Sequence, residues 1–369
     1  METTLGDMAA GGFKPLVDDA MTAKLTPKII RLSQRLLEIK KSGRFVLLRF
    51  HHDADGISGA FAISEVLRLS PYQQNSAVYS ARDAVRDLSN IAHEERPVVI
   101  LLDFGMNAES AEGLRLLKAA GAEVILIDHH PASKETTALA DFFLTPWEFP
   151  EGENPSRYVA GYLASEVGRA CGADTEGYAR IACAGDKSSL LGHEEEAVRK
   201  ALVLDYLAAN SGFGNNLRFY KNVLAKRELF ESMYGQADEK IGEAADKAMK
   251  GMKERKAGGV AVFIIELEKA VRKGEFPNRS KVTTRVFERL GRDEPMVVLG
   301  AGGRTIIIRM NDAATAKGVG ADAIAKKLAA TMRDFVESGG GHGKAGAVRI
   351  KEGFSGAVVE EILKILSSA

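Results

Sequence analysis

The chain has 369 residues, of which 45% are hydrophobic and 27% are charged. This length suits two domains better than one, and the apolar content is enough for packed cores, which excludes a largely disordered chain. Basic and acidic residues balance at 50 each, and the apolar runs fall far below the roughly 20 residues that span a bilayer, so we expect no membrane partner.

The two cysteines, Cys171 and Cys183, do not form a CxxC pair. We therefore expect no disulfide framework and a cytoplasmic location. The N-terminal segment has no basic flank followed by an apolar core, so no signal peptide is expected.

Residues 258–369 hold 18 basic and 13 acidic side chains, whereas residues 1–257 hold 32 and 37. This division suits an acidic part that holds cations and a basic part that holds an anionic ligand, although chance surface variation explains it equally well.

The first half of the chain alternates helical and strand patterns. In chain order these predict a helix (27–42, ending at Gly43), a strand (44–50), a helix (58–69), a strand (97–103), a helix (108–120), a strand (123–128) and a mostly helical stretch (156–210). Strand, helix and strand joined by short connections are typical of a parallel sheet with helices on its faces.

The second half begins with a long connecting helix, predicted over 219–256. The elements predicted after it are a strand (260–267), a helix (281–290), two strands around the turn 301–303, a helix (321–336), a glycine-rich loop (338–346), a short strand and a last helix. The sequence thus predicts an α/β protein with a parallel-sheet domain (1–218), a helical linker (219–257) and a smaller α/β domain (258–369). We expect the active site in the cleft between the two domains.

Three of the predicted strands end on acidic residues and histidines. These residues are His51, His52, Asp53 and Asp55 after the first strand, Asp103 after the second, and Asp128, His129 and His130 after the third. A single aspartate after a strand is commonly a turn former or helix cap. In an open parallel sheet, however, functional groups gather beyond the carboxyl ends of the strands. Carboxylates with imidazoles suit Mn²⁺, Mg²⁺ or Zn²⁺, so the pattern favours a metal site, with enough ligands for two ions.

Six short motifs together resemble those of a known superfamily. HHDADG (51–56), LLDFG (101–105), LIDHHP (126–131) and CAGDKS (183–188) resemble, in this order, the four motifs of the DHH phosphoesterase superfamily. TIIIRM (305–310) and SGGGHGKAG (338–346) resemble the arginine strand and the Gly-Gly-Gly-His loop of the C-terminal domain that accompanies many members. The likeness covers roughly residues 44–350.

The resemblance implies a role for each matching position. The implied metal ligands are His51, Asp53, Asp55, Asp103, His129 and Asp186, with Asp103 bridging two Mn²⁺ or Mg²⁺ ions. Asp103, Asp128 and His130 would serve catalysis: Asp128 would orient His129, and His130 would face the scissile phosphate. Arg309, Gly340, Gly341 and His342 would hold the nucleotide or its phosphates. A bridging hydroxide would attack the phosphodiester.

Two further segments allow more than one interpretation. The Gly-Lys pair near residue 344 suggests a P-loop, but Ser338 stands where the first glycine is required and Ala345 replaces the Ser/Thr. A helix C-cap with a flexible turn is the structural alternative, and close approach of backbone N–H groups to phosphate is the one we favour. Trp147 is predicted to be a packed loop anchor, with stacking on a base as the alternative.

We therefore expect a RecJ-like exonuclease that degrades single-stranded DNA or RNA, or short oligonucleotides. A hydrolase of nano-RNA, cyclic or linear dinucleotides or phosphoadenosine phosphate remains an alternative, because the surroundings of Arg309 and His342 depart from the superfamily pattern. A non-catalytic replication scaffold is disfavoured by the complete ligand set. About 27 residues follow His342, too few for an extra OB-fold. A helicase or replisome protein is a further expected partner, as is a second copy of the chain.

Overall fold

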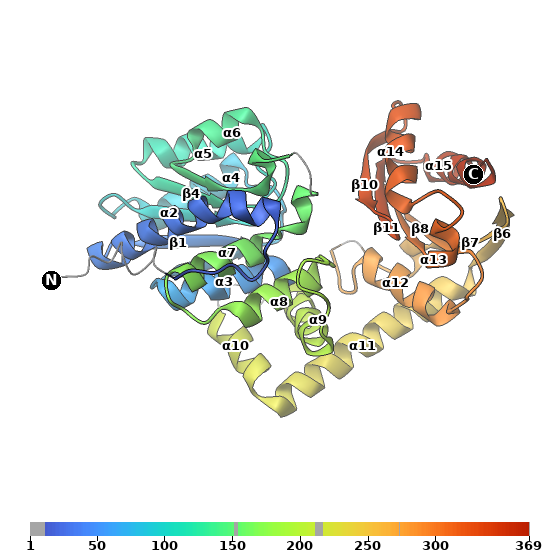
Figure 1. Cartoon of the computed structure of the whole chain (residues 1–369), viewed down its shortest axis with the longest axis horizontal. Helices are drawn as coiled ribbons and strands as arrows, with labels where there is room; N and C mark the ends of the chain where they lie inside the picture. Colours follow the sequence, from blue (N-terminus) through green and yellow to red (C-terminus); the bar gives the residue numbers. More distant parts are fainter. Residues whose placement is uncertain (1–11, 151–153, 211–216, 273, 369) are drawn as a thin grey trace. The chain divides into compact units, whose positions relative to one another are not determined.

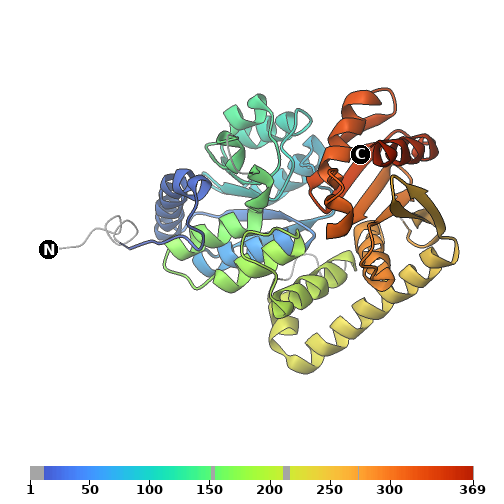
Figure 2. The same ribbon diagram turned by 45° about the vertical axis from the view of Figure 1, so that its right-hand side comes forward.

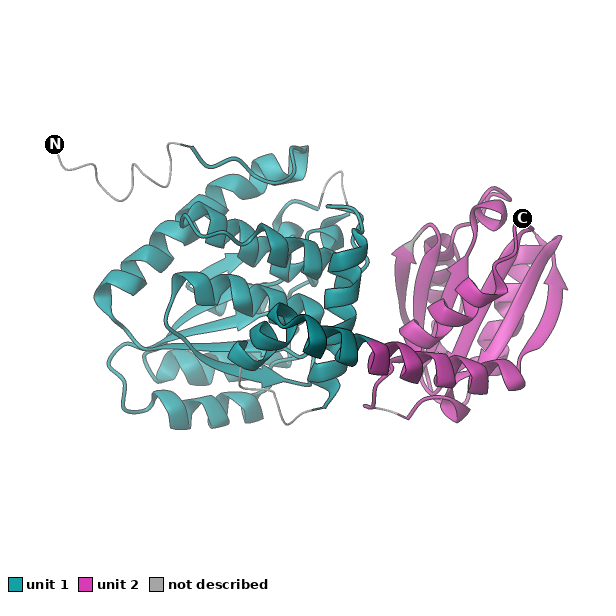
Figure 3. Ribbon diagram, turned by 90° about the horizontal axis from the view of Figure 1, so that it is seen from below, with its two compact units in different colours: residues 1–234 teal, residues 235–369 magenta. Residues whose placement is uncertain are grey.

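The computed structural model describes residues 12–150, 154–210, 217–272 and 274–368 (Figure 1). The chain divides into two compact units, residues 1–234 and 235–369 (Figure 3). Helix α11 (Arg227–Lys250) belongs to both units, and the division falls inside it. No helix in the described ranges is both long and apolar enough to cross a bilayer.

The first unit contains a five-stranded sheet in which all neighbouring strands are parallel. Its order is β2 (Ser70–Gln74), β1 (Val46–His51), β3 (Val98–Leu102), β4 (Glu123–Ile127) and β5 (Phe142–Leu144). The chain leaves β1 toward β2 and then returns to the other side of β1 with β3. The strand order therefore reverses between β1 and β3, and such a switch point opens a crevice at the carboxyl ends of the strands.

Helices cover both faces of this sheet (Figures 1 and 2). Helices α4 (Ala81–Ile91) and α5 (Ser110–Ala119) pack on one face, where strand residues such as Val99 and Leu126 are fully buried. Helices α2 (Ala20–Ser42), α3 (Ala54–Val66) and α7 (Ala160–Ala170) lie on the other face. Within the described residues the unit also contains α6 (Lys134–Leu139), α8 (Glu176–Gly185), α9 (Glu195–Ala209), α10 (Leu217–Ala225) and the start of α11, with short 3₁₀ turns η1 (Pro146–Glu148) and η2 (Pro155–Arg157).

The second unit contains a six-stranded mixed sheet. Its order is β10 (Val336–His342), β11 (Ala345–Ile350), β9 (Thr305–Met310), β8 (Met296–Gly302), β7 (Val260–Glu266) and β6 (Lys253–Ala257), with only the β7–β8 pair parallel among these strands. Helices α14 (Ala321–Thr331) and α15 (Ser355–Ser367) contribute to the core on one face. Helix α12 (Arg279–Leu290) and the end of α11 pack on the other. The short elements η4 (Leu267–Lys269) and α13 (Asp312–Thr315) complete the unit.

The predicted fold class, an α/β protein with a parallel-sheet domain and a smaller α/β domain joined by a long helix, is confirmed, but several predicted elements are wrong in detail. The segment 219–256 is not one helix, because Lys253–Ala257 forms the edge strand β6, paired with β7. Its Lys- and Glu-rich composition resembles that of a helix, yet charged side chains also suit an exposed edge strand. Helix α3 begins at Ala54 rather than near Ser58, since the Asp53 carboxylate accepts a hydrogen bond from Gly56 N–H and caps the helix.

The glycine-rich segment predicted as a loop is instead an antiparallel hairpin of β10 and β11. The P-loop and helix C-cap interpretations are both wrong for this reason. Two of the glycines let helix α14 approach the sheet: a Cβ on Gly339 would lie 2.5 Å from the Ala325 carbonyl oxygen, and one on Gly346 would lie 2.8 Å from that of Ala321. Packing against α14 therefore explains part of the glycine content without any ligand.

Candidate metal centre

The acidic residues and histidines at the strand ends of the first unit lie together at the carboxyl edge of the sheet. His51 ends β1, Asp103 and Asp128 follow β3 and β4, and Asp186 follows helix α8. Three overlapping groups have ligand atoms within 4.8 Å of one another; they are His51–Asp53–Asp103, Asp103–His129–His130 and Asp55–His129–Asp186. All six ligands implied by the sequence therefore lie in one cluster.

Asp103 occupies the centre of this cluster. Its Oδ2 lies 3.4 Å from His51 Nδ1, and its Oδ1 lies 3.5 Å from His129 Nε2 and 3.7 Å from His130 Nδ1. The side chain is buried, and Oδ1 has no hydrogen-bond partner in the described structure. The backbone of Asp103 has a φ of 64°, which is unusual for a residue other than glycine and is found at functional sites. A buried carboxylate oxygen without a donor fits a bound cation.

Backbone contacts fix the orientation of Asp55 and His129. Both carboxylate oxygens of Asp55 accept hydrogen bonds from the start of α7, from Ala160 N–H at 3.0 Å and Gly161 N–H at 2.8 Å. His129 Nδ1 lies 3.1 Å from the Ser156 carbonyl oxygen, so Nδ1 carries the proton and Nε2 is the free nitrogen. His129 Nε2 lies 3.4 Å from Asp186 Oδ2 and 3.9 Å from Asp55 Oδ2. This arrangement is typical of a metal-binding histidine held by a second contact.

The predicted role of Asp128 needs correction. Asp128 Oδ1 does not contact the His129 ring; it lies 2.8 Å from His130 Nδ1. The same oxygen accepts the backbone N–H groups of His129 and His130, at 2.8 and 3.2 Å. A short aspartate side chain commonly folds back onto the N–H groups that follow it. Asp128 thus orients His130, and the carbonyl of Ser156 takes the role that we assigned to Asp128.

Charge accumulates in this cluster. Burial opposes ionisation of Asp103, yet the nearby imidazoles of His129 and His51 hold its pKa well below the usual value. For His129, burial is outweighed by Asp103 and Asp186, which raise its pKa well above the usual value. Burial and the carboxylates of Asp103 and Asp186 raise the pKa of Asp55 well above normal, and burial with Asp53 and Asp103 raises the pKa of Asp186 to about 6. The negative charge of the clustered carboxylates therefore exceeds the positive charge of the nearby imidazoles. Divalent cations would supply the missing positive charge.

Comparison with known proteins agrees with this geometry. Residues 45–185 match the N-terminal domain of the DHH family. This segment of the chain, which contains His51, Asp103 and His129, is a DHH-family N-terminal domain. An uncharacterized protein from Methanocaldococcus jannaschii is 24% identical to it, over 96% of this chain and 55% of that protein. The chain thus spans about half the length of this curated relative.

Two solved structures share the fold of this chain. A DHH domain from a member of the S1p family of ribosomal proteins has a TM-score of 0.78 at 24% identity and covers 98% of this chain and 96% of that one. RecJ from Thermus thermophilus, solved in complex with Mn²⁺, has a TM-score of 0.56 at 14% identity, over 98% of this chain and 57% of that one. The likeness to the first extends over both units.

Sequence analysis missed one residue that supports this cluster of carboxylates and imidazoles. Asp205, in the last turns of α9, accepts a hydrogen bond from Ala54 N–H at 2.8 Å. This contact holds the turn that carries Asp53 and Asp55. Nothing in the sequence pointed to Asp205, because it lies inside a helix about 150 residues away.

Arg309, the implied phosphate-binding arginine of the second unit, lies on β9. Its Nε donates to Thr284 Oγ1 at 3.0 Å, and its terminal nitrogens donate to Ser280 Oγ at 2.7 Å and to the Ile308 carbonyl at 2.9 Å. Burial lowers the pKa of Arg309. Within the described residues, no carboxylate forms an ion pair with it. A partly buried guanidinium held by neutral groups suits an anionic ligand.

The other three implied binding positions lie on β10. Position 342 on β10 pairs with Ala345 on β11, which pairs in turn with Arg309 on β9. Positions 342 and 309 therefore lie in the same row of residues across the three strands. The His342 side chain lies outside the described residues. At Gly341 a Cβ would collide with the Ala345 carbonyl oxygen, and its φ of 147° favours glycine. No atom lies within 4 Å of a Cβ placed on Gly340, so its backbone is open to a ligand.

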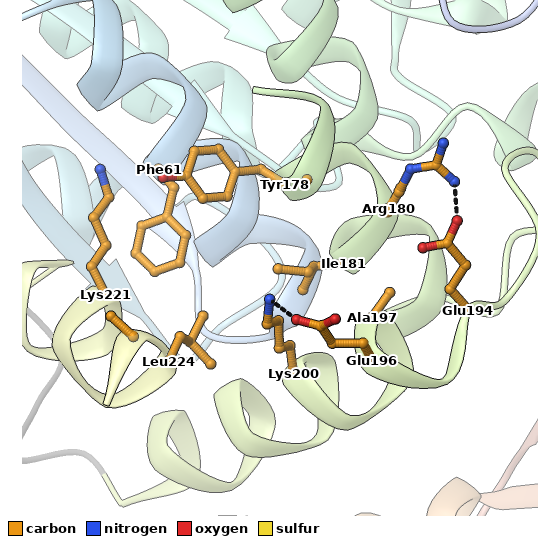
Figure 4. A pocket seen from close by; sticks show the side chains of 12 residues that line it. Phe61, Tyr178, Arg180, Ile181, Glu194, Glu196, Ala197, Lys200, Lys221 and Leu224 are labelled. Atoms are coloured by element: carbon orange, nitrogen blue, oxygen red, sulfur yellow. Dashed lines mark hydrogen bonds and ion pairs between the residues drawn. The ribbon is translucent and has the colours of Figure 1, made fainter. Parts of the chain in front are cut away.

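A separate pocket of about 490 Å³ lies among α3, α8, α9 and α10 (Figure 4). Lys221 Nζ lies 5.4 Å from the ring centre of Phe61 and 5.6 Å from that of Tyr178, and it pairs with Glu65 at 2.6 Å. Arg180 pairs with Glu194, and Lys200 with Glu196, as Figure 4 shows. Because these cations are already paired, we assign the pocket no role in binding phosphate.

Proposed function

We propose that this DHH-family protein is a metal-dependent phosphodiesterase that hydrolyses single-stranded nucleic acid from an end, as a RecJ-like exonuclease. The observation that supports this proposal most strongly is the position of Asp103. Its carboxylate lies between His51 and His129, one imidazole on each oxygen, and one of these oxygens is buried without a hydrogen bond. Such a carboxylate suits a bridge between two cations.

The two halves of the cluster would each hold one divalent ion. His51, Asp53 and Asp103 would hold the first, and Asp55, His129 and Asp186, with Asp103, would hold the second. Carboxylate and imidazole ligands suit Mn²⁺, and Mg²⁺ is the alternative; RecJ from T. thermophilus binds Mn²⁺ in its crystal structure. Bound ions would neutralise the phosphodiester and lower the pKa of water.

His130 is the residue of this chain best placed to act on the phosphate. Asp128 holds His130 Nδ1 at 2.8 Å, which leaves Nε2 as the free nitrogen of a ring whose side chain is 42% exposed. Burial lowers the pKa of His130, but Asp128 outweighs it and raises that pKa above the usual value. A protonated His130 would donate a hydrogen bond to a non-bridging phosphate oxygen and stabilise the charge that develops there.

The test is digestion of DNA and RNA 20-mers labelled at the 5′ or the 3′ end, with Mn²⁺ present. We expect shortening of the strand from one end and loss of that activity in Asp103→Asn, which keeps the shape of the side chain but removes its charge. Glu196→Gln, on the exposed face of α9, is the matched control and should retain activity. Retained activity in Asp103→Asn would refute the proposal.

The same assay, run also on strands of two to five nucleotides and on phosphoadenosine phosphate, distinguishes the alternative substrate class. Cleavage restricted to strands of two to five nucleotides, or to phosphoadenosine phosphate, would replace the exonuclease by a small-substrate hydrolase. The cluster around Asp103 would serve either reaction, so the length profile, and not the metal dependence, decides between them.

A further inference from the structure

A second pocket of the first unit lies where β5 ends and α6 begins. It measures about 520 Å³, and its walls include Lys28, Lys134, Thr137, Phe143, Thr145 and Trp147. We refer to it as the Trp147 pocket. Phe143 and Thr145 are buried, Trp147 is half-buried, and Lys134 and Thr137 are exposed. The pocket therefore combines an aromatic wall with a polar, accessible rim.

The Trp147 pocket adjoins the metal centre. The indole Nε1 of Trp147 donates a hydrogen bond of 2.8 Å to the backbone carbonyl of His129. Ala132, another wall residue, follows His130 by two positions. Strands β4 and β5 are parallel neighbours, so the residues that follow them lie at the same edge of the sheet. A ligand that reaches the metal centre thus has this pocket as its neighbour.

Two lysines, Lys28 and Lys134, lie in the wall of the pocket, and only Lys134 is free to bind an anion. Lys28 is engaged by Glu148 and by the Phe143 carbonyl, to which it donates at 3.2 Å. Lys134 is the first residue of α6, and it forms no ion pair with any carboxylate in the part of the chain that the structure describes. An accessible ammonium without a partner suits a phosphate oxygen.

The aromatic wall favours a flat ring. Indole and nucleobase stack face to face, and each such contact contributes about 1–3 kcal/mol whatever the base. The hydroxyl of Thr137 already donates to the Ser133 carbonyl at 2.9 Å, and Thr145 Oγ1 already accepts a hydrogen bond from the backbone N–H of Trp147 at 3.3 Å. Stacking, rather than hydrogen bonding to base edges, is what these walls offer.

We propose that the Trp147 pocket holds the nucleotide next to the scissile phosphate, with its base on the indole and its flanking phosphate on Lys134. This inference rests on the proposed function and deepens it. The substrate must then carry a base beside the bond that is cleaved, and the identity of that base should matter little. Trp147 has two roles, because its ring contacts the base while its N–H supports the carbonyl of His129.

Trp147 is the single tryptophan of the chain, so intrinsic fluorescence reports on this pocket directly. The full chain is titrated in EDTA, where no hydrolysis occurs, with a short oligodeoxyadenylate. The matched probe is an oligomer of the same length and charge with abasic sites. We expect saturable quenching by the first and none by the second. Equal quenching by both, or none by either, overturns the proposal.

Three variants, with one control, separate the roles of the ring, the indole N–H and the charge. Trp147→Phe and Trp147→Ala both lose the N–H to His129, but only the second loses the ring, so only Trp147→Ala should raise KM, by about tenfold or more. An equal loss in both would show that Trp147 acts only through His129 and would overturn the proposal. Lys134→Gln should weaken binding in the quenching titration about fivefold, and Lys41→Gln, an exposed lysine of α2, should leave it unchanged.

Failure of this inference and failure of the proposed function give different results. Quenching is measured without metal and hydrolysis is measured with it. Metal-dependent degradation without base-dependent quenching would refute the pocket and leave the exonuclease. Base-dependent quenching with no hydrolysis under Mn²⁺ or Mg²⁺ would refute the exonuclease and leave the pocket.

Discussion

Asp128 Oδ1 lies 2.8 Å from Nδ1 of His130, two residues further along the chain. Asp128 is 1% exposed, and its oxygen also receives two backbone N–H groups, so its position is fixed. His129, between the two, has its own partner in the Ser156 carbonyl. The two adjacent histidines therefore have separate supports, one from a carboxylate and one from a carbonyl, and this difference suits them to different tasks.

The first prediction follows from this pairing. Asp128→Asn removes the charge that raises the pKa of His130 and favours its protonated form, so we expect kcat to fall at neutral pH by about 10- to 100-fold, the scale on which supporting contacts act. His130→Gln should cause a similar loss. Because the two residues act as one unit, the double variant should be no worse than either single variant. Losses that multiply in the double variant would contradict the pairing.

A second prediction concerns protons. The carboxylates around His51 and His129 overcome the effect of burial and raise the pKa of both imidazoles well above the usual value, which favours the protonated form of both rings in the metal-free protein. Metal ligation requires neutral imidazole, and binding must therefore release protons. We expect metal affinity to rise with pH. Calorimetry in two buffers with different ionisation enthalpies measures the release, and a heat independent of the buffer would contradict it.

A third prediction concerns stability. Asp87, on α4, is fully buried and accepts hydrogen bonds from Arg49 Nε at 2.8 Å and from the Tyr79 hydroxyl at 2.9 Å. Replacing Asp87 by alanine leaves the Arg49 guanidinium buried without its partner, and we expect a loss of about 3–5 kcal/mol in the free energy of unfolding. Urea denaturation measures this. Replacing both partners by apolar residues should restore part of the loss; a double variant as unstable as Asp87→Ala would argue against the unpaired charge as the cause.

A fourth prediction concerns the thiols. Burial raises the pKa of Cys171 and of Cys183 to about 12, so the reactive thiolate is scarce at neutral pH. A thiol reagent should label neither cysteine quickly in the native protein and both in guanidinium chloride. Fast labelling of native Cys183, which is fully buried, would show that helix α8 opens readily.

Several elements of the fold could be predicted because their signals are local. The apolar runs before Asp103 and Asp128 are strands within two residues of the predicted bounds, since buried parallel strands leave such runs in the sequence. Gly43 ends α2 with a φ of 66°, as its place after a helical pattern indicates. Helix α4 was missed although Ser80 and Asp83 form a capping box that the sequence displays.

Other elements left no signal of their own. Strand β2 (SPYQQ) contains a proline and polar residues, and it is a strand because it lies at an edge and pairs with β1. The glycines of β10 resemble a flexible loop until α14 is placed beside them. In both cases the segment that supplies the hydrogen bonds or the close contact is not adjacent in the chain. Its contacts outweigh the low strand propensity of the local sequence.

The sequence by itself determined which side chains stand at the ends of the central strands, because that depends only on the order of apolar and acidic residues. It also determined that a metal-binding set of carboxylates and imidazoles would meet, since parallel strands end at one edge. Only the tertiary structure decided what each of them contacts: the Ser156 carbonyl contacts His129, Asp128 contacts His130, Asp205 contacts the first turn of α3, and the Trp147 indole contacts the His129 carbonyl. These contacts join segments that are distant in the chain. The sequence does not show which distant segments will lie side by side, so it could not predict the contacts.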